Sequence, residues 1–431
     1  MFNNRLILGT AFAALIFTAS AWANESQKVK REDREPEAAT GLTVKKAVVA
    51  KDYMVAAANP YASQAGLNIL AKGGSAIDAA VTVQLVLTLV EPQSSGIGGG
   101  AFILHWDKDR QHLTTFDGRE TAPKAASPDM FLTDTGKAIS WIEAVVGGRS
   151  VGVPGVLHAL KKAHDKYGQL PWAELFKEPI ALAENGFKVS PRLEKLVAMQ
   201  FNPGITQLAE INNYFFPNGQ GIKAGQILKN PKLANVYRAI AKEGITPFYQ
   251  GWIAKKIVSA VRNASVAPGH LSQEDMASYQ SKQMAPVCGP YHQYQVCGMA
   301  PPSSGGVAVI QMLGQLEPFK LSQYAADSLE SVHLFTQSSR LAFADRNKYI
   351  ADMDFVSVPV QGLLEKSYLD NRAKQINMQR DMGKAEAGQP VGGLARALDN
   401  AIEMPSTSHI SIVDGQGNAI SMTTSIEMAF G

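Results

Sequence analysis

The sequence is poor in cysteine and has almost no excess of either charge. Only two of its 431 residues are cysteines, Cys288 and Cys297, and no second Cys or His pair has the spacing of a zinc site. The 41 basic residues nearly balance the 38 acidic ones, which leaves a formal net charge of +3. Nucleic acids and anionic membrane surfaces attract strongly basic patches, so this balance disfavours both as partners. Chemistry on a small molecule is the better expectation.

The N-terminus lacks an apolar run long enough for an uncleaved membrane anchor, which needs about 20 residues. Arg5 precedes a shorter apolar stretch, and Ala21-Trp22-Ala23 supplies the small residues of a cleavage site. Residues 1–23 are therefore typical of a secretory signal peptide, and we expect a periplasmic or secreted protein without a membrane span after its removal. Residues 24–40, rich in charge and poor in large apolar groups, would form a flexible leader.

The two cysteines stand in a near-repeat, Val-Cys-Gly, at residues 287–289 and 296–298. If residues 291–295 form the turn of a hairpin, the two sulfurs meet and can oxidise in an exported protein. Closing so short a loop adds about 2 to 3 kcal/mol of stability on the chain-entropy model. Two reduced, buried thiols fit the sequence nearly as well, so both states stay open.

Composition and periodicity indicate a sizeable core built from helices and strands. With 45% hydrophobic residues, the chain is long enough for one large domain or a few ordinary ones. Ser75, with Asp78 three residues later, predicts the start of a helix that is apolar on nearly every side and therefore buried. Internal repeats and heptads are not evident. The expected helices span residues 61–72, 75–90, 156–167, 171–186 and 329–349, and the expected paired strands span residues 102–106 and 113–116.

The most informative segment begins at Thr407. Ile410 and Ile412 alternate with other residues, residues 414–418 have turn-forming chemistry, and a second β-prone stretch follows. This pattern predicts a β-hairpin with a threonine at the start of its first strand. By itself, such a threonine is most often one more β-branched residue in a half-buried strand.

The whole segment, residues 407–431, resembles the catalytic signature of the γ-glutamyltransferases. It keeps a histidine two residues after the threonine, a Gly-Asn turn, serine and threonine pairs and a closing Phe-Gly. It departs from the commonest pattern at Ile420 and Ser425. Further matches follow the family's order, at residues 96–100, 117–123, 301–306 and 341–346. The resemblance therefore covers the chain from about residue 48 to residue 431.

The resemblance implies a precursor that cuts its own chain between Ser406 and Thr407. Cleavage would give Thr407 a free α-amine, which in simple peptides titrates at about 7.7 to 8.0 and can accept the proton of the threonine hydroxyl. The resemblance also implies an α+β fold, the four-layer αββα sandwich of the N-terminal-nucleophile hydrolases with its two central sheets. Residues 41–406 would form the large-subunit region, and residues 407–431 would begin the small subunit.

Residues 381–406 precede the implied cleavage site. They are rich in glycine and small polar residues and have few aromatic anchors, which is typical of a mobile linker. Mobility would let the strand that bears Thr407 separate from the preceding chain. An ordinary surface loop has the same composition, so this alternative stays open.

By the same resemblance, three further residues contact the substrate or the nucleophile. Arg119 would bind the α-carboxylate of the γ-glutamyl group through two charge-assisted hydrogen bonds, and an ion pair with Asp117 or Glu120 is the alternative. Glu427 would contact the α-amino group of the substrate. Ser425 would help to hold the amine of the catalytic threonine, unless it is a solvent-facing serine of the strand.

The implied activity is a self-processing γ-glutamyl transfer. The threonine would take the γ-glutamyl group of glutathione or a related amide and pass it to water or to an amino-acid or peptide acceptor. No metal or organic cofactor is implied, and the cleaved chain would be a heterodimer of large and small subunits. The family's small subunit continues beyond this hairpin and supplies the oxyanion hole, where one lost donor costs about 100- to 1000-fold in rate. We therefore expect residues 1–431 alone to be unprocessed and inactive.

Two other functions are compatible with parts of the sequence. An acylase that acts on cephalosporin-type amides would share the threonine mechanism. A periplasmic binding protein would suit an exported chain of mixed helices and strands, but it would not need the hairpin that begins at Thr407.

Three short motifs compete with this interpretation. Residues 148–152 match the G-x-S-x-G nucleophile elbow of α/β-hydrolases, but Pro154-Gly155 falls where an elbow needs a helix. Residues 96–101 match a dinucleotide-binding fingerprint, which requires a following helix, whereas a strand is predicted there. His409 lies on the same strand face as Thr407, but no orienting acid is evident nearby, so a structural role is favoured.

Overall fold

The computed structural model describes residues 46–394 and 407–431. The strands are β1 (Met54–Ala56), β2 (Gly100–Asp107), β3 (His112–Gly118), β4 (Phe187–Lys188), β5 (Ile227–Leu228), β6 (Lys282–Met284), β7 (Val287–Tyr291), β8 (Tyr294–Gly298), β9 (Thr407–Val413) and β10 (Ala419–Ser425). The expected signal peptide, the charged leader and Ser406 lie outside the described residues.

The α-helices are α1 (Pro60–Ala71), α2 (Ala76–Val90), α3 (Trp141–Val145), α4 (Val156–Tyr167), α5 (Lys177–Asn185), α6 (Pro191–Met199), α7 (Gly204–Gln207), α8 (Ala209–Phe215), α9 (Pro231–Glu243), α10 (Thr246–Tyr249), α11 (Trp252–Arg262), α12 (Gln273–Ser278), α13 (Gly305–Leu316), α14 (Leu329–Tyr349), α15 (Val360–Leu364) and α16 (Lys366–Ala373). Short 3₁₀ segments span Trp172–Phe176, Pro217–Gly219 and Leu321–Gln323.

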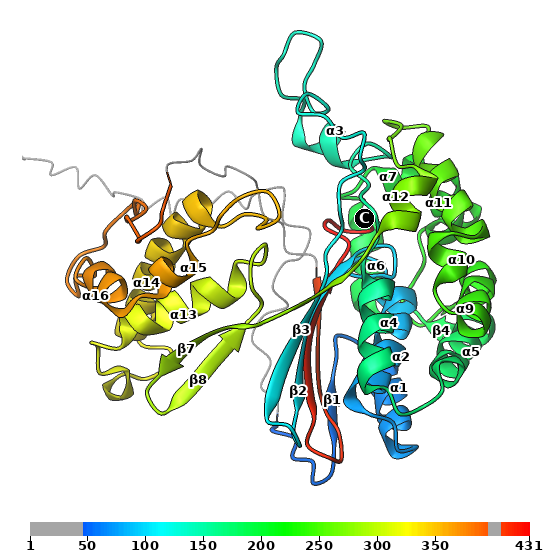
Figure 1. Cartoon of the computed structure of the whole chain (residues 1–431). Helices are drawn as coiled ribbons and strands as arrows, with labels where there is room; N and C mark the ends of the chain where they lie inside the picture. Colours follow the sequence, from blue (N-terminus) through cyan, green and yellow to red (C-terminus); the bar gives the residue numbers. More distant parts are fainter. Residues whose placement is uncertain (1–45, 395–406) are drawn as a thin grey trace, which may run out of the picture.

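The centre of the fold is a six-stranded antiparallel sheet with the strand order β1-β9-β10-β2-β3-β6. The predicted hairpin forms β9 and β10, and Figure 1 shows it in red beside β1 and β2. The predicted pair over residues 102–106 and 113–116 forms β2 and β3. Of the two central sheets that the resemblance implies, the described residues form this one, and the overall class is α+β as predicted.

Helices α1, α2 and α4 cover one face of this sheet (Figure 1). The sequence predicts α2 as a core helix, and every residue of α2 except Thr88 is buried. Ser75 caps it with the predicted capping box, because the Ser75 hydroxyl and the Asp78 carboxylate each accept a backbone N–H of the other residue. The expected helices at residues 61–72, 156–167 and 329–349 are α1, α4 and α14.

The expected helix over residues 171–186 is instead a 3₁₀ segment that continues into α5. Pro179 has no N–H to donate to the carbonyl of Leu175, four residues earlier. That carbonyl accepts the hydroxyl of Thr82 on α2 instead, at 2.9 Å. The irregular start of the helix is therefore held to the core by a side chain from a different element.

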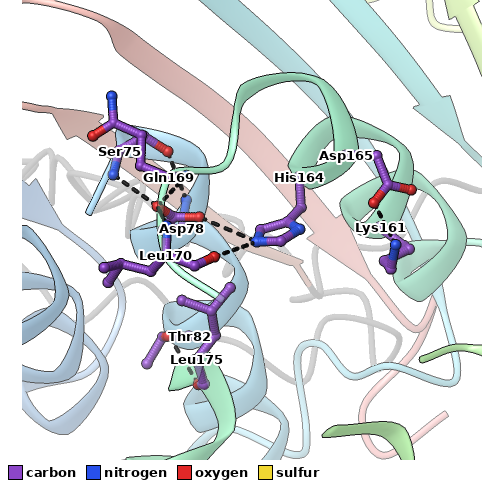
Figure 2. A network of polar contacts seen from close by, with 9 residues as sticks. All are labelled: Ser75, Asp78, Thr82, Lys161, His164, Asp165, Gln169, Leu170 and Leu175. Atoms are coloured by element: carbon purple, nitrogen blue, oxygen red, sulfur yellow. Dashed lines mark hydrogen bonds and ion pairs between the residues drawn. The ribbon is translucent and has the colours of Figure 1, made fainter. Parts of the chain in front are cut away.

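The fully buried carboxylate of Asp78 joins the start of α2 to the chain that follows α4 (Figure 2). Its Oδ2 accepts the backbone N–H groups of Ser75, Gln169 and Leu170 at 2.9, 2.9 and 3.0 Å. Its Oδ1 lies 3.4 Å from Nε2 of His164, a residue of α4. Because a buried carboxylate must be paired or hydrogen-bonded, these contacts fix α4 against α2.

The hairpin is fixed to the same end of α2 through Asp414, which is 2% exposed. Asp414 Oδ2 accepts the backbone N–H of Ala76 at 3.0 Å, and its Oδ1 accepts those of Gln416 and Asn418 at 3.0 and 2.9 Å. A carboxylate at a helix N-terminus is favourable, because the free N–H groups and the helix dipole both attract negative charge. The turn that joins β9 to β10 is therefore anchored to the core.

A second group of helices, α13 to α16, lies on the other side of the sheet from α1, α2 and α4 (Figure 1). Its interior contains the buried carboxylate of Asp345, which pairs with Arg372 at 3.2 Å and accepts the hydroxyl of Tyr368 at 2.8 Å. Asp345 also accepts the N–H of Gly388 at 2.8 Å, and Arg340 donates to Asp381 at 2.6 Å. Residues 381–394, the first part of the predicted linker, therefore contact α14.

The two cysteines form a disulfide. Cys288 and Cys297 are cross-strand partners in the β7–β8 hairpin, with an S–S distance of 2.06 Å. The structure thus decides between the two states that the sequence leaves open. Among the helices of residues 46–394 and 407–431, none has the length and apolar character that crossing a membrane requires.

Candidate active site

Four of the residues that matter for the predicted chemistry line up across one end of the central sheet. Thr407 on β9 lies opposite Ser425 on β10, and Ser425 lies opposite Gly100 on β2. The next strand, β3, pairs with β2 up to Gly118, which Arg119 directly follows. Neighbouring strands lie about 4.8 Å apart, so three spacings separate the backbones of Thr407 and Arg119 by about 14 Å. An arginine side chain and a γ-glutamyl group together can span this distance.

The direction of Thr407 follows from the alternation of β9. Ser408, Ile410 and Ile412 are buried on the face that packs on α2, whereas Thr407 and His409 are exposed on the opposite face. Once the register of β9 places Ser408 in the interior, Thr407 beside it can only point to the opposite face. The predicted nucleophile is therefore accessible to a substrate.

Arg119 is half-exposed, and its backbone is fixed from both sides. Its N–H donates to Asp117 Oδ1 at 2.8 Å, and its carbonyl accepts the hydroxyl of Tyr279 at 2.8 Å. Its Nε lies 3.6 Å from Oε2 of Glu120, so the ion pair that the sequence left as an alternative is present. Such an exposed pair contributes little stability, and its guanidinium keeps donors for another carboxylate. The role of Arg119 in substrate binding stays a prediction.

Glu120 directly follows Arg119, and sequence reasoning did not select it as a site residue. Its carboxylate fills the space above Gly100, where a Cβ would lie 2.3 Å from Glu120 Oε2. Burial raises the pKa of the Glu120 carboxyl above its ordinary value; the Arg119 guanidinium opposes this rise, and repulsion from Glu427 adds to it. A glutamate beside an arginine is visible in the sequence, but its position over a glycine of another strand is not.

Ser425 and Glu427 are linked directly. The Ser425 hydroxyl accepts the backbone N–H of Glu427 at 3.0 Å. Glu427 is exposed and has a φ of 75°, which is uncommon for a residue with a side chain and is found often at functional sites. Glu427 lies close enough to Glu120 for its negative charge to raise the pKa of the Glu120 carboxyl. The predicted contacts of Ser425 with the nucleophile and of Glu427 with the substrate stay predictions.

The loop between α2 and β2 also reaches this end of the sheet, and sequence reasoning missed its polar residues. The hydroxyls of Ser95 and Ser408 lie 3.2 Å apart, and Gln93 accepts the N–H of Phe430 through its backbone carbonyl at 3.2 Å. The available signal was a polar run, residues 91–95, between an apolar helix and a glycine-rich segment, which is an unusual composition for a buried loop.

Two competing motifs are wrong, for structural reasons. The segment before the G-x-S-x-G match is helix α3 rather than a strand, and the Ser150 hydroxyl donates to the carbonyl of Val145 at 3.0 Å. A nucleophile elbow needs a strand there and a helix directly after the serine, whereas α4 begins only at Val156. The dinucleotide match at residues 96–101 runs into β2, as predicted, and lacks the required helix.

The same glycine-rich segment does permit a close approach of backbones. A Cβ on Gly99 would lie 2.0 Å from the carbonyl oxygen of Ser425, so only glycine fits there. His409 contacts the hydroxyls of Thr423 at 2.9 Å and Ser421 at 3.4 Å, both on the neighbouring strand. Within residues 46–394 and 407–431, no group of three or more His, Cys, Asp or Glu side chains is arranged to hold a metal ion.

Comparison with known proteins identifies the family to which this geometry belongs. The family model described as gamma-glutamyltranspeptidase matches residues 62–431. The chain belongs to the gamma-glutamyltranspeptidase family. It is 38% identical over 390 residues to the glutathione hydrolase proenzyme of Bacillus subtilis (strain 168). The aligned region covers 89% of this chain and 66% of that protein. It is 34% identical over 406 residues to the acylase ACY 1 proenzyme of Pseudomonas sp. (strain V22), covering 92% and 69%.

The structural likeness confirms the predicted α+β fold of the N-terminal-nucleophile hydrolase type. The crystal structure of Helicobacter pylori gamma-glutamyltranspeptidase superposes with a TM-score of 0.75 at 31% identity, over 83% of this chain and all of that one (100%). This member of the gamma-glutamyltranspeptidase family spans about two thirds of the length of the curated relatives that it matches, such as the Bacillus protein at 66%.

Proposed function

We propose that the protein is a self-processing γ-glutamyl hydrolase and transferase whose nucleophile is Thr407. The observation that carries this proposal is the row of Thr407, Ser425, Gly100 and Arg119 across one end of the sheet. The family membership supports the same chemistry. Glutathione and related γ-glutamyl amides are the proposed substrates, since curated relatives bear the name glutathione hydrolase proenzyme.

In the first reaction, the Thr407 hydroxyl attacks the carbonyl carbon of Ser406. The peptide bond between them breaks, an ester forms, and the nitrogen of Thr407 becomes a free α-amine. Water then hydrolyses the ester, which releases the Ser406 carboxylate and regenerates the hydroxyl. The product is a heterodimer of a large and a small subunit, with Thr407 at the start of the small one.

In turnover, the α-amine of Thr407 accepts the proton of its own hydroxyl as the oxygen attacks the γ-carbonyl of the substrate. The proton passes to the departing amine, and a γ-glutamyl ester remains on Thr407. Water or the amine of an amino acid or peptide then takes the γ-glutamyl group. Ser425 helps to hold the α-amine.

The charges at this end of the sheet suit the zwitterionic end of a γ-glutamyl group. The Arg119 guanidinium can bind the α-carboxylate with two hydrogen bonds, and the exposed Glu427 carboxylate can bind the α-ammonium group. Holding both ends of the glutamyl backbone restricts the γ-carbonyl to a position beside the threonine hydroxyl. Positioning of this kind makes the attack effectively intramolecular, which accounts for a large part of the rate enhancement in many enzymes.

The test is N-terminal sequencing of the complete gene product after expression. The smaller band should begin Thr-Ser-His-Ile-Ser, and purified protein should hydrolyse a γ-glutamyl anilide. Thr407→Ala should give one uncut band and no turnover, whereas the control Ser411→Ala, on the same strand face, should be cut and active. Two bands and full turnover from Thr407→Ala would overturn the proposal, and an uncut, inactive wild type would favour a binding protein.

A second candidate is an acylase, because the chain is 34% identical to the acylase ACY 1 proenzyme. The threonine mechanism is the same, so cleavage alone does not separate the two. A γ-glutamyl substrate needs Arg119 and Glu427, whereas an acyl amide without an α-amino acid end does not. Comparison of kcat/KM for a γ-glutamyl anilide and for a cephalosporin-type amide in wild type and Arg119→Lys distinguishes them.

The remaining parts of the proposal concern location. A signal peptide at residues 1–23 would direct the chain out of the cytoplasm. N-terminal sequencing of the larger band should begin at Asn24, and fractionation of cells should recover the activity from the periplasm or the medium.

A further inference from the structure

We propose, on the basis of the function inferred for Thr407, that Ser95 is a positioning residue. Through its hydrogen bond to Ser408, it fixes the direction in which Thr407 presents its hydroxyl and its α-amine. The two serine hydroxyls lie 3.2 Å apart although the residues are 313 positions apart in the chain. Neither serine touches the proposed substrate, so the effect on catalysis passes through the backbone of β9.

Both hydroxyls lie in the interior, since Ser95 is 1% exposed and Ser408 is 2% exposed. A buried hydroxyl that loses its partner is costly, which keeps this pair together. Successive strand residues point to opposite faces, so a fixed Ser408 also fixes the Cα–Cβ direction of Thr407. The bond therefore acts on the nucleophile from the face opposite the substrate.

Thr407 has few other constraints once the chain is cut. Cleavage removes its covalent link to Ser406 and leaves it as the first residue of the strand. In the described sheet, β1 pairs only with Ser411 to Val413 of β9, so residues 407–410 pair with β10 alone. Ser408 is thus the first residue after the cleavage site that has a described contact outside β10, and this contact is its hydrogen bond with Ser95.

Ser95 is itself held by the backbone of Glu91, a residue that is 2% exposed and whose carboxylate is fixed by its own partners. The Glu91 side chain accepts Asn59 Nδ2 at 2.7 Å and pairs with Arg192 Nη1 at 3.3 Å. The Glu91 carbonyl accepts the N–H of Ser95 at 3.3 Å. A buried charge with this many partners resists displacement. The loop therefore offers Ser408 a rigid partner.

The same loop also contacts the second strand of the hairpin. Phe430 donates its N–H to the carbonyl of Gln93 at 3.2 Å, and Gly99 lies against the carbonyl of Ser425. One segment, residues 91–99, thus sets the positions of the strand ends that present Thr407 and Ser425. A shift of this segment would move the nucleophile relative to the groups that bind the substrate.

The experiment measures kcat, KM and the rate of self-cleavage for Ser95→Ala, Ser408→Ala and the double variant of the complete gene product. Each single variant should lower kcat for a γ-glutamyl anilide about tenfold, with KM unchanged, because the orientation of the nucleophile is lost and the substrate contacts are kept. The double variant should be no worse than either single one, because both remove the same bond. Ser95→Thr, which keeps the hydroxyl, should recover most of the rate.

The matched control is Thr424→Val. Thr424 lies directly opposite Ser408 on β10, is fully buried, and its hydroxyl has no hydrogen-bond partner in the described part of the chain. Its replacement removes a hydroxyl from the same interior face and should leave kcat unchanged.

If Ser95 had a purely structural role, Ser95→Ala would lower the melting temperature and leave kcat of the folded enzyme at the wild-type value.

Wild-type kcat in both alanine variants, or losses that multiply in the double variant, would overturn the proposal. If one alanine variant does not fold, the other removes the same bond from the opposite side and decides the question. Thr407→Ala separates this outcome from failure of the proposed function. Should Thr407→Ala be inactive while Ser95→Ala and Ser408→Ala are fully active, only the positioning role is wrong.

Discussion

Thr407 and Ser425 are cross-strand partners at the open end of the β9–β10 hairpin. Their pairing depends on a register that the turn and the buried face fix together. Asp414 closes the turn through its bonds to Gln416 and Asn418, while Ser408, Ile410 and Ile412 face the interior. A slip of one residue would move the apolar set to the exposed face, so the register is strongly determined. The two hydroxyl-bearing residues therefore meet.

Removing the hydroxyl of Ser425 should slow catalysis without removing the nucleophile. We expect Ser425→Ala to lower kcat about tenfold, because the α-amine of Thr407 loses a partner and the backbone N–H of Glu427 loses its acceptor. Ser425→Thr should keep wild-type turnover. Ser421→Ala, four residues earlier on β10, is the control, and steady-state kinetics with a γ-glutamyl anilide make the comparison. A wild-type rate in Ser425→Ala would contradict the assigned role.

The fork geometry of Arg119 should matter more than its charge. Arg119→Lys keeps a cation but cannot make two parallel hydrogen bonds to one carboxylate, so KM should rise about 10- to 100-fold while kcat changes less. Arg110→Lys is the matched control, because Arg110 is exposed in the turn between β2 and β3 and pairs only weakly with Asp107, at 3.7 Å. An unchanged KM in Arg119→Lys would favour the purely structural ion pair with Glu120.

Buried His105 should make the protein sensitive to acid. His105 is 2% exposed and stacks on Tyr167 with ring centroids 3.9 Å apart. Burial lowers the pKa of His105 from 6.5 to about 4, and the carboxylates of Asp107 and Asp414 only partly oppose this shift. Above pH 6.5 both folded and unfolded states hold a neutral ring. As the pH falls from there toward 4, His105 becomes protonated in the unfolded state but stays neutral in the folded state, so the free energy of unfolding decreases.

The replacement His105→Phe tests this mechanism, because phenylalanine keeps the stacked ring and cannot be protonated. Wild type should lose about 3 kcal/mol of unfolding free energy through this group between pH 7 and pH 4, and the variant should lose that much less. Urea unfolding at both pH values gives the difference, with the exposed His112→Gln as control. Equal pH dependence in His105→Phe and wild type would show that the His105 ring binds its proton equally well in the folded and unfolded states.

The disulfide should contribute measurably to stability. Cys288 and Cys297 are 9 positions apart in the sequence. For a loop this short, the chain-entropy model gives a stabilisation of about 2 to 3 kcal/mol. Dithiothreitol should therefore lower the urea midpoint of the wild type. A Cys288→Ala/Cys297→Ala variant should start at the lower midpoint and show no response to the reductant. An identical midpoint for wild type with and without reductant would mean that the bond does not stabilise the fold.

Local patterns predicted those parts of the fold that local physics determines. The alternation of Ile410 and Ile412 predicted β9, and the Ser75–Asp78 capping box predicted the start of α2. Both signals act within a few residues, so the sequence contains all the information needed. The helix over residues 171–186 was predicted less well, because Pro179 changes the hydrogen bonding and Thr82, far away in the chain, supplies the replacement.

The residues of the candidate site also fall into those that local motifs predicted and those that depend on tertiary contacts. Thr407, Ser425, Arg119 and Glu427 were found from motifs, since each stands in a run of residues whose order is informative. Glu120 over Gly100 was not found, and neither was the disulfide state of Cys288, because each depends on which strands become neighbours. The sequence disfavoured a nucleophile elbow at Ser150 because of Pro154-Gly155, and the structure adds that a helix, α3, and not a strand precedes the serine.

The sequence by itself determined the family, because residues 407–431 and the runs before them keep the order of a known signature, and the chemistry proposed for Thr407 follows from that resemblance. Only the tertiary structure decided how that threonine is held. The contacts between Ser95 and Ser408 and between Ala76 and Asp414 join residues 313 and 338 positions apart. They are made by ordinary serines and an ordinary aspartate, whose importance comes from burial beside a partner and not from any pattern in the chain.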